Sequence, residues 1–545
     1  MSAARATNPR VQEGTVLRSH LDRSGDAYRE NRRVAEQQLV ELGAQLDLVR
    51  DGGGQRYRDR HHSRGRLLVR ERLELLLDRD AHFLELSSLA AWGSEFTVGA
   101  SILTGIGVVS GVEVVVIAHD PTVRGGAMNP YSLKKTLRAL EIARVNRLPV
   151  INLVESGGAD LPTQADLFVP GGTIFHDLTE LSAMGVPTVA LVFGNSTAGG
   201  AYVPGMCDYS VLVDQQAKVF LGGPPLVKMA TGEESDDEDL GGAAMHARVS
   251  GLADHFAVDE RDAIRIGRRI LSELGWRKLG PGPTLPAEPP IHDPDELLGI
   301  APADVRVPFD PREVLARVVD GSRFGEYKPD YGTSIVTGWA SVHGFPVGVI
   351  ANANGVLFSE EAKKATEFIQ LANQIDTPLV FLQNTTGYMV GASYEQGGII
   401  KDGAKMINAV TNSTVPHLTV NMAASFGAGN YGMSGRAYSP RLMVAWVGAK
   451  LAVMGAAQLA GVMSILGKAS ADASGRPFDQ PADDVRRAAI EAQITRESHS
   501  FFVSGKLYDD GVIDPRDTRS VLAIALSATH SGPVEGRRGY GVFRM

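Results

Sequence analysis

Two short glycine-rich segments carry the residues of this sequence best suited to chemistry. Each follows an apolar segment of strand length, and each ends in a tyrosine. Glycines after a strand let the backbone approach a ligand and point its N–H groups outward, where they stabilise an oxyanion. We therefore predict four catalytic positions, Gly199, Gly200, Gly429 and Asn430, and four substrate-binding neighbours, Ala198, Ala201, Ala428 and Tyr431. A plain strand-to-helix turn at both places remains the alternative.

Familiar catalytic patterns are absent from both segments. The sequence contains no phosphate-loop pattern, and neither segment has the nucleophile-elbow pattern. Ser196 precedes the glycines without an obvious acid–base relay, so we interpret it as a turn residue. Paired backbone holes without a nucleophile favour enolate chemistry, in which two carbonyl oxygens, one on each reactant, are stabilised.

The two segments belong to an internal repeat. A shift of 229 positions places Lys135 on Lys364, Gly158 on Gly387, and Gly200 on Gly429, without gaps over about 70 residues. Such self-similarity indicates a duplicated domain. We expect Gly200 and Gly429 to occupy the same place in two superimposable units.

Alternating strand and helix patterns recur in both halves. The apolar segments at 112–118 and 150–154 flank an amphipathic helix at 132–145, and the pattern returns at 347–351, 360–373 and 379–382. Strands that alternate with helices in this way are typical of α/β proteins. The prediction is an α/β fold.

The remaining parts of the chain divide it into regions. Residues 26–80 look helical, with an apolar stripe at Leu39, Leu42, Leu46 and Val49 and a stop at the glycines 52–54. We expect the arginines of a second helix, 66–77, to form a solvated face, with a docking surface as the alternative. The density of proline between 280 and 302 excludes a helix or central strand. The expected division is an N-terminal helical extension (1–80), a first domain (81–280), a linker (281–305) and a second domain (306–545).

Composition excludes several classes of function. The chain of 545 residues has a formal net charge of −9 and a pI near 5.9, so bulk charge predicts no binding to nucleic acid or membrane. The one cysteine, Cys207, is expected to be a packing residue. No apolar run reaches membrane-span length, and residues 1–12 lack the apolar core of a secretory signal. We expect a cytoplasmic protein without a metal, in which His119, Glu155 and His417 are structural.

Several motifs carry a family resemblance. His62-Ser63-Arg64-Gly65-Arg66-Leu67, Thr197-Ala198-Gly199-Gly200-Ala201-Tyr202 and Phe381-Leu382-Gln383-Asn384-Thr385-Thr386-Gly387 lie within a similarity that runs from about residue 56 to residue 545. Over this range the chain resembles the β subunit, or carboxyltransferase subunit, of biotin-dependent acyl-CoA carboxylases. The resemblance implies two tandem crotonase-like domains, each a ββα superhelix. The alternative of a non-catalytic assembly subunit is disfavoured because both glycine segments are intact.

Within the family, the sequence looks most like 3-methylcrotonyl-CoA carboxylase. The segment from Ser425 to Pro440 and the last five residues resemble that branch, whereas 167–178 and 444–450 depart from it. Both departures bear on the acyl pocket. Geranyl-CoA, propionyl-CoA or a longer acyl-CoA therefore remain alternative substrates, and a biotin-dependent decarboxylase subunit is an alternative enzyme.

The resemblance also implies the reaction and its partners. A partner subunit carries biotin and a biotin carboxylase, carboxybiotin releases CO2 in the site, and the acyl-CoA enolate attacks it. Lys405, in Ala404-Lys405-Met406, is interpreted as helix surface rather than as a biotin attachment site. The family further implies a homohexameric core, with active sites between the first half of one protomer and the second half of another.

Overall fold

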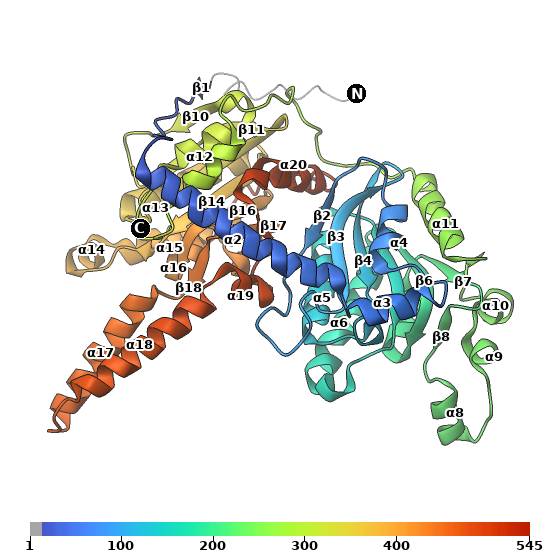
Figure 1. Ribbon diagram of the computed structural model, residues 1–545. Coiled ribbons are helices and arrows are strands. Elements are labelled where there is room, and N and C mark those ends of the chain that lie inside the picture. Colours follow the sequence, from blue (N-terminus) through green and yellow to red (C-terminus); the bar gives the residue numbers. More distant parts are fainter. Residues whose placement is uncertain (1–13) are drawn as a thin grey trace.

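The computed structural model describes residues 14–545. The segment Met1–Gln12, for which no secretory signal is expected, lies outside the described residues. The chain forms two α/β domains side by side, with a long helical hairpin projecting from the second (Figure 1).

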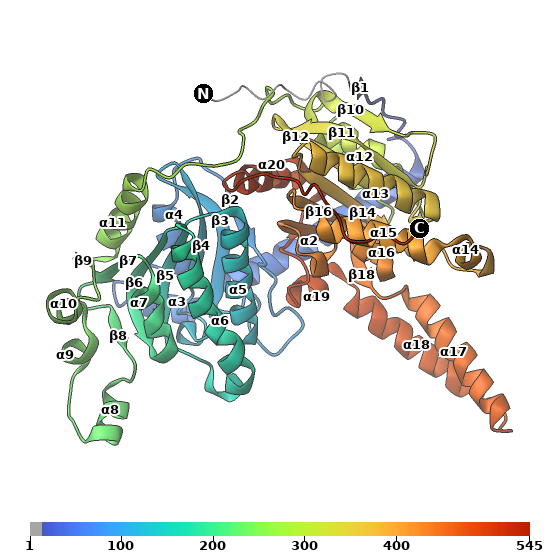
Figure 2. The ribbon, with the colours of Figure 1, turned by 180° about the vertical axis from the view of Figure 1, so that it is seen from behind.

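The first domain is built on an eight-stranded sheet in the order β2-β3-β4-β5-β6-β7-β9, with β8 paired to the end of β6. The β3–β4 pair is antiparallel, and the strands that follow are parallel. Helices α5 and α6 cover one face of this sheet (Figure 2). The elements are β2 (Phe83–Leu86), β3 (Ile102–Val109), β4 (Val112–His119), α5 (Pro130–Asn146), β5 (Val150–Ser156), α6 (Gln164–Ala183), β6 (Thr188–Thr197), α7 (Tyr202–Met206), β7 (Tyr209–Val213), β8 (Lys218–Phe220), α8 (Pro224–Thr231), α9 (Asp237–Gly241), α10 (Ala243–Met245), β9 (His255–Ala257) and α11 (Glu260–Glu273).

The second domain repeats this plan in a nine-stranded sheet, β1-β10-β11-β12-β14-β16-β17-β19, with β18 paired to β16. Its elements are α12 (Pro311–Val318), β10 (Arg323–Tyr327), β11 (Ile335–Val342), β12 (Phe345–Asn352), β13 (Val356–Leu357), α13 (Ser359–Gln374), β14 (Leu379–Thr385), β15 (Gly387–Tyr388), α14 (Ala392–Gly397), α15 (Ile399–Asn412), β16 (His417–Phe426), α16 (Gly427–Gly432), β17 (Leu442–Trp446), β18 (Lys450–Ala452), α17 (Ala456–Ala473), α18 (Gln480–Glu497), α19 (Ser500–Gly505), β19 (Val512–Ile513) and α20 (Thr518–Thr529). The fold class and the duplication are as predicted.

Two buried lysines make equivalent contacts in the two halves of the repeat. The ammonium group of Lys135, on α5, donates to the carbonyl oxygen of Ile102 at 2.8 Å. That of Lys364, on α13, donates to the carbonyl oxygen of Ile335 at 2.9 Å. Both side chains are 1% exposed. Because a buried charge must be satisfied by hydrogen bonds, each lysine fixes its helix against a strand of its own sheet, Lys135 against β3 and Lys364 against β11.

The N-terminal region joins the two domains. Helix α2 (Asp26–Asp51) buries Leu42, as the apolar stripe predicts, and ends at Gly52, which is left-handed at φ 56°. Near its start Asn31 donates to the carbonyl oxygen of Gly299 at 3.2 Å, and just beyond its end the N–H of Gly53 donates to Thr122 Oγ1 at 3.0 Å. The helix therefore spans both halves of the molecule (Figure 1).

The arginines of the second predicted helix differ from expectation. The predicted helix 66–77 corresponds to α4 (Val69–Leu76), and a separate short helix, α3 (Gln55–His62), precedes it. Arg72 is 1% exposed and forms ion pairs with Glu155 at 2.7 Å and with Glu260 at 2.8 Å. The solvated-face interpretation is wrong for Arg72, because two carboxylates from distant parts of the sequence meet it in the interior, which helix periodicity alone does not reveal.

The proline-rich segment also holds more structure than predicted. A 3₁₀ helix, η5 (Pro294–Gly299), begins at a proline and buries Leu297 and Leu298. Proline is compatible with the first position of a helix, since its missing N–H has no partner there in any case. The domain boundaries near residues 80, 280 and 305 stay a prediction.

Strand β1 (Thr15–Val16) pairs with β10 of the second domain. Among residues 14–545, no helix is long and apolar enough to cross a membrane.

Two adjacent carboxylates, Asp509 and Asp510, are buried between the domains. Asp509 accepts a hydrogen bond from the N–H of Gly511 at 3.0 Å, and its other oxygen has no partner among the described residues. Burial raises the pKa of Asp509 to about 7. Its folded pKa thus exceeds its unfolded value, so the stabilisation it provides is complete below about pH 4 and is lost as the pH rises through about 7.

Replacing this group predicts a change in the pH dependence of stability. In Asp509→Asn the side chain is permanently neutral, so the free energy of unfolding relative to wild type should improve steadily between about pH 4 and pH 7 and then level off. Urea unfolding at several pH values measures this difference. The exposed Asp304, whose pKa lies near 2, supplies the control, since Asp304→Asn should show no such trend in that range. A pH-independent difference for Asp509→Asn would contradict the assignment.

Candidate active site

The first glycine segment forms a tight turn at the end of a central strand. Strand β6 ends at Thr197, and a 3₁₀ turn, η3 (Ala198–Ala201), follows at once. The hydroxyl of Ser196 donates to the carbonyl oxygen of Gly200 at 2.9 Å, which closes the turn and confirms its interpretation as a turn residue. In a 3₁₀ turn that has Thr197 as its N-cap, the N–H of Gly199 has no intrahelical acceptor, whereas that of Gly200 lies opposite the carbonyl oxygen of Thr197. The N–H of Gly199 is therefore free to meet a ligand.

An apolar cavity of about 520 Å³ opens beside this turn. Its polar lining includes His119, Ser156 and Ser196, and helix α6 supplies much of its apolar wall. All of its lining residues belong to the first domain: His119, Met128, Val154, Ser156, Gly158, Ala159, Leu161, Gln164, Leu167, Phe168, Gly171, Gly172, Ile174, Phe175, Ser196, Ala198, Gly199, Gly200 and Val203. The segment that departs from the methylcrotonyl pattern, 167–178, therefore shapes this cavity.

The second glycine segment has the same geometry. Strand β16 ends at Phe426, and α16 begins at Gly427. Gly427 has φ 54°, and Ala198, its equivalent in the first half, also has φ 54°. In both halves the strand pairing is irregular just before the turn, at Val154/Ser156 and at Gln383/Thr385. Gly200 and Gly429 therefore occupy equivalent positions, as the repeat predicts.

The free amides of the second turn are shifted by one residue from the predicted pair. With Phe426 as the N-cap, the N–H groups of Ala428 and Gly429 lack an intrahelical acceptor, whereas that of Asn430 lies opposite the N-cap carbonyl. The side chain of Asn430 instead donates to Ser425 Oγ at 2.8 Å. The sequence predicts Gly429 and Asn430 as the two N–H donors of this turn. In the structure, the free N–H groups are those of Ala428 and Gly429.

A buried polar chain fixes this second turn. Ser425 Oγ donates to Gln383 Oε1 at 2.8 Å, and Gln383 Nε2 donates to the carbonyl oxygen of Met433 at 2.8 Å. Together with Asn430, these groups connect the strand before the turn to the residue after it. Buried polar groups that are all satisfied hold a single geometry.

The predicted substrate-binding neighbours occupy different environments. Ala198 lines the cavity, whereas Ala201 is buried in a separate apolar cluster behind the turn. Ala428 is exposed, and Tyr431 is half exposed with its ring 5.7 Å from that of Tyr438. Thus Ala198, Ala428 and Tyr431 are accessible to a ligand, and Ala201 supports the turn from within.

Other candidate side chains have structural surroundings. Burial lowers the pKa of His417 to about 3, and two serine hydroxyls hold its ring nitrogens. Burial raises the pKa of Cys207 to about 12, which excludes a reactive thiolate at neutral pH. Lys405, on α15, is largely buried rather than on the helix surface as expected, and it is paired with the buried Asp402 at 2.9 Å. His119, at the end of β4, forms a hydrogen bond through Nδ1 with the carbonyl oxygen of Leu153 at 3.3 Å and is part of the cavity wall.

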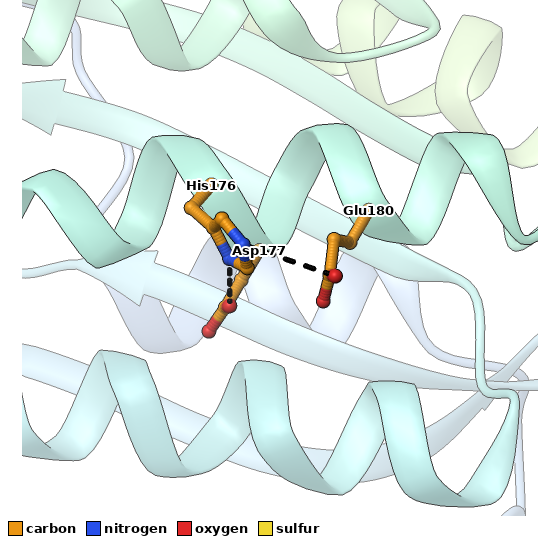
Figure 3. Close-up of side chains that lie close together, drawn as sticks. All are labelled: His176, Asp177 and Glu180. Carbon is orange, nitrogen blue, oxygen red and sulfur yellow. Dashed lines mark hydrogen bonds and ion pairs between the residues drawn. The ribbon is translucent and has the colours of Figure 1, made fainter.

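One exposed group on α6 has the composition of a metal site (Figure 3). His176 Nδ1 lies 3.0 Å from Asp177 Oδ1, and Nε2 lies 3.8 Å from Glu180 Oε1. The hydrogen bond with Asp177 raises the pKa of His176. None of the three side chains lines the cavity. These contacts on one helix account for the group's arrangement, and we assign it no role in the reaction.

The chain is similar to known proteins over almost its whole length. The carboxyl transferase domain family matches residues 60–539.

The chain belongs to the carboxyl transferase domain family.

Several of its relatives are β subunits of carboxylases. A probable biotin-dependent acyl-coenzyme A carboxylase beta2 subunit of Mycobacterium tuberculosis is 63% identical over 97% of this chain and 100% of that protein. The biotin-dependent 3-methylcrotonyl-coenzyme A carboxylase beta1 subunit of the same organism is 48% identical, over 93% of this chain and 96% of the relative. The crystal structure of the β subunit of geranyl-CoA carboxylase from P. aeruginosa is 40% identical and superposes with a TM-score of 0.88, covering 97% and 99% of the two chains. The resemblance stated from the sequence is confirmed, and this member of the family is a carboxyltransferase.

Ala198 provides a test of the turn geometry. At φ 54° the backbone of a β-branched residue is strained, whereas glycine adopts this angle without strain, as Gly427 does in the second half. Ala198→Val should lower the free energy of unfolding by roughly 1–3 kcal/mol and reduce activity. Ala198→Gly should keep both close to wild type. Denaturant unfolding and a transcarboxylation assay measure the two effects, and equal behaviour of the two variants would exclude a left-handed residue here.

Proposed function

We propose that this enzyme transfers a carboxyl group from carboxybiotin, carried by a partner subunit, to 3-methylcrotonyl-CoA. One observation carries the proposal: two matched turns present unpaired backbone N–H groups, and the first of them opens into an apolar cavity. The first turn, through Gly199, takes the thioester oxygen. The second, through Ala428 and Gly429, takes the ureido oxygen of biotin.

The two turns act by electrostatics rather than by side-chain chemistry. Carboxybiotin supplies CO2 and, once decarboxylated, the base that removes the substrate proton. The N–H of Gly199 stabilises the enolate oxygen that develops as this proton leaves. The N–H groups of Ala428 and Gly429 stabilise the negative charge on the ureido oxygen. No side chain of the cavity wall has to titrate, which agrees with the lowered pKa of His119.

The substrate is the finer part of the proposal. Relatives named for 3-methylcrotonyl-CoA support it, at 48% and 47% identity. Geranyl-CoA is the second candidate, because Gly171 and Gly172 face the cavity from α6 with open space in front of both. That missing side-chain volume leaves room for a longer acyl chain.

The assembly is also part of the proposal. The cavity at the first turn contains no residue of the second domain, so a second chain is needed to bring a second turn to the substrate. Exposed apolar side chains beside the cavity mouth, Leu161, Phe168 and Val169, offer a surface for such a contact. We propose a homo-oligomer with composite sites, hexameric and cytoplasmic as the family resemblance implies, working with a biotin carboxylase and biotin carrier subunit.

Blocking either turn should abolish carboxyl transfer. A side chain at position 200 meets only Ser196 Oγ, at 3.8 Å, so Gly200→Val should fold while filling the site of the thioester oxygen. Losing one oxyanion donor typically costs about 10²–10³ in rate. Transfer from a carboxylated biotin carrier to 3-methylcrotonyl-CoA measures the loss. Near wild-type turnover in a normally assembled Gly200→Val enzyme would contradict the proposal.

Two controls sharpen this experiment. Cys207→Ser should leave turnover nearly unchanged, since Cys207 only packs beside Asn152. Gly429→Ala brings a Cβ to 2.6 Å from Thr385 Oγ1 and 3.0 Å from Gly387 Cα, so it should distort the second turn. Gly200→Val and Gly429→Ala chains, refolded together, should regain activity if sites are composite, because some pairs then combine two intact turns.

Filling the open part of the cavity should separate the two candidate substrates. Gly172→Leu should reduce kcat/KM for geranyl-CoA roughly tenfold or more and spare 3-methylcrotonyl-CoA, because only the longer chain reaches the added side chain. Thr173→Leu, one residue along α6 and outside the cavity lining, is the matched control. A panel of acyl-CoA substrates gives the ratios. Equal losses for both substrates would place the acyl chain elsewhere.

A further inference from the structure

A buried ionic contact joins the two domains behind the second turn. Arg138, in the middle of α5 of the first domain, is 5% exposed and meets Asp510, which is 1% exposed, in a bidentate pair. Arg138 Nε donates to Asp510 Oδ1 at 2.8 Å, and Arg138 Nη2 donates to Oδ2 at 2.9 Å. Such paired geometry fixes both partners in orientation as well as in distance.

The same two residues form hydrogen bonds with the segment that follows the second turn. Arg138 Nη2 also donates to the carbonyl oxygen of Pro440 at 2.9 Å. Asp510 accepts from Arg436 Nη1 at 3.1 Å and from the N–H of Met443 at 2.8 Å. The stretch 436–443 is thus held at its start, middle and end by one arginine–aspartate pair.

This segment in turn contacts the second turn directly. The N–H of Gly435 donates to the carbonyl oxygen of Asn430 at 2.9 Å, and the ring of Tyr438 packs 5.7 Å from that of Tyr431. Arg441 reaches back to the end of α5, where it donates to the carbonyl oxygen of Val145 and to Asn146 Oδ1 at 3.2 Å. A helix of the first domain therefore forms the support of a turn in the second.

The repeat shows that this contact is not a general feature of the fold unit. The position equivalent to Arg138 in the second half is Glu367, which is exposed and pairs with Lys328 on the surface. By contrast, the neighbouring Lys135 and Lys364 keep the same contacts in both halves. Position 138 thus serves a contact between the domains, and the other half has no counterpart.

Helix α5 also borders the other half-site. Leu133 and Leu140 of α5 share an apolar core with Leu167, Ile174 and Leu178 of α6. Leu167 and Ile174 line the acyl cavity. One helix therefore supports the cavity wall on one side and the segment behind the second turn on the other.

We propose that Arg138 is a positioning residue for the second turn: through Asp510 it holds the segment 436–443, and thereby sets the geometry that receives the biotin ureido group. The inference rests on the proposed function in one respect, the assignment of biotin to the second turn. Arg138 touches neither reactant and acts through the backbone that it holds.

Arg138→Lys tests this with the charge retained. Lysine is a point charge and cannot reproduce the bidentate pair together with the carbonyl contact. The reverse reaction, from the carboxylated acyl-CoA to free d-biotin, gives a KM for each reactant. We expect the KM for d-biotin to rise about tenfold, with the KM for the CoA ester within twofold of wild type. Amide hydrogen exchange, without either reactant, should become faster in 434–443 and stay unchanged in 196–202.

The matched control is Arg317→Lys. Arg317 is 1% exposed, pairs with Glu296 and Glu313, and lies in the second domain away from the turn. It should lower thermal stability without separating the two KM values. If Arg138→Lys does not assemble, Arg436→Gln decides, since it removes a single 3.1 Å contact from a partly exposed side chain and should shift the same KM in the same direction.

The outcomes separate this inference from the function on which it rests. If Gly429→Ala raises the KM for d-biotin and neither Arg138→Lys nor Arg436→Gln does, the positioning role is overturned while the proposed function stands. If Gly429→Ala leaves d-biotin unaffected, the assignment of biotin to the second turn fails, and this inference with it. Equal shifts of both KM values, or the same split in Arg317→Lys, would also overturn it.

Discussion

The structure depends on one backbone constraint, a left-handed residue placed immediately after a central parallel strand. At Ala198 and at Gly427 the chain reverses sharply enough that the next amides point away from the strand and begin a helical turn. The first of those amides have no acceptor within their own helix, because the first N–H groups of any helix lack one. The sheet provides the rigidity, and the turn provides the unpaired donors. Every other feature of the site either holds this turn in place or shapes the space before it.

The two copies of this arrangement are supported differently. In the first half, Ser196 closes the turn with a single hydrogen bond, and α6 leaves an apolar cavity in front of it. In the second half, Asn430, Ser425 and Gln383 form a buried polar chain, and the segment behind the turn is tied to the other domain by Arg138 and Asp510. Duplication thus preserved the strand, the bulge and the left-handed residue, while the surroundings diverged. This divergence is consistent with two turns that receive chemically different carbonyl groups.

Buried charge organises the scaffold beyond the site. Lys135 and Lys364 fix helices to sheets through carbonyl oxygens, Arg72 joins α4 to Glu155 and Glu260, and Arg138 joins the domains. Isolated buried charges are costly, so each of these is satisfied by several partners. Helix α2 adds an apolar bridge through Leu42 across the same boundary. These contacts therefore join the first domain to the second, and a substitution on α5 affects the packing of both domains.

The sequence by itself determined the α/β class, the duplication, the place of both turns and the family, because each rests on local pattern: strand and helix periodicity, a constant offset of 229 positions, and glycines directly after apolar runs. Tertiary structure alone decided which amides are free. Whether Ala428 or Asn430 is a free donor depends on where α16 begins, and that is set by the φ angle of Gly427 rather than by composition. Likewise, Arg72 resembled a surface residue, and Arg138 was one position in an amphipathic helix, until Glu260 and Asp510, far away in the chain, met them in the interior. Pairing between distant charges leaves no mark on local periodicity, since it is created only when folding brings the two segments together.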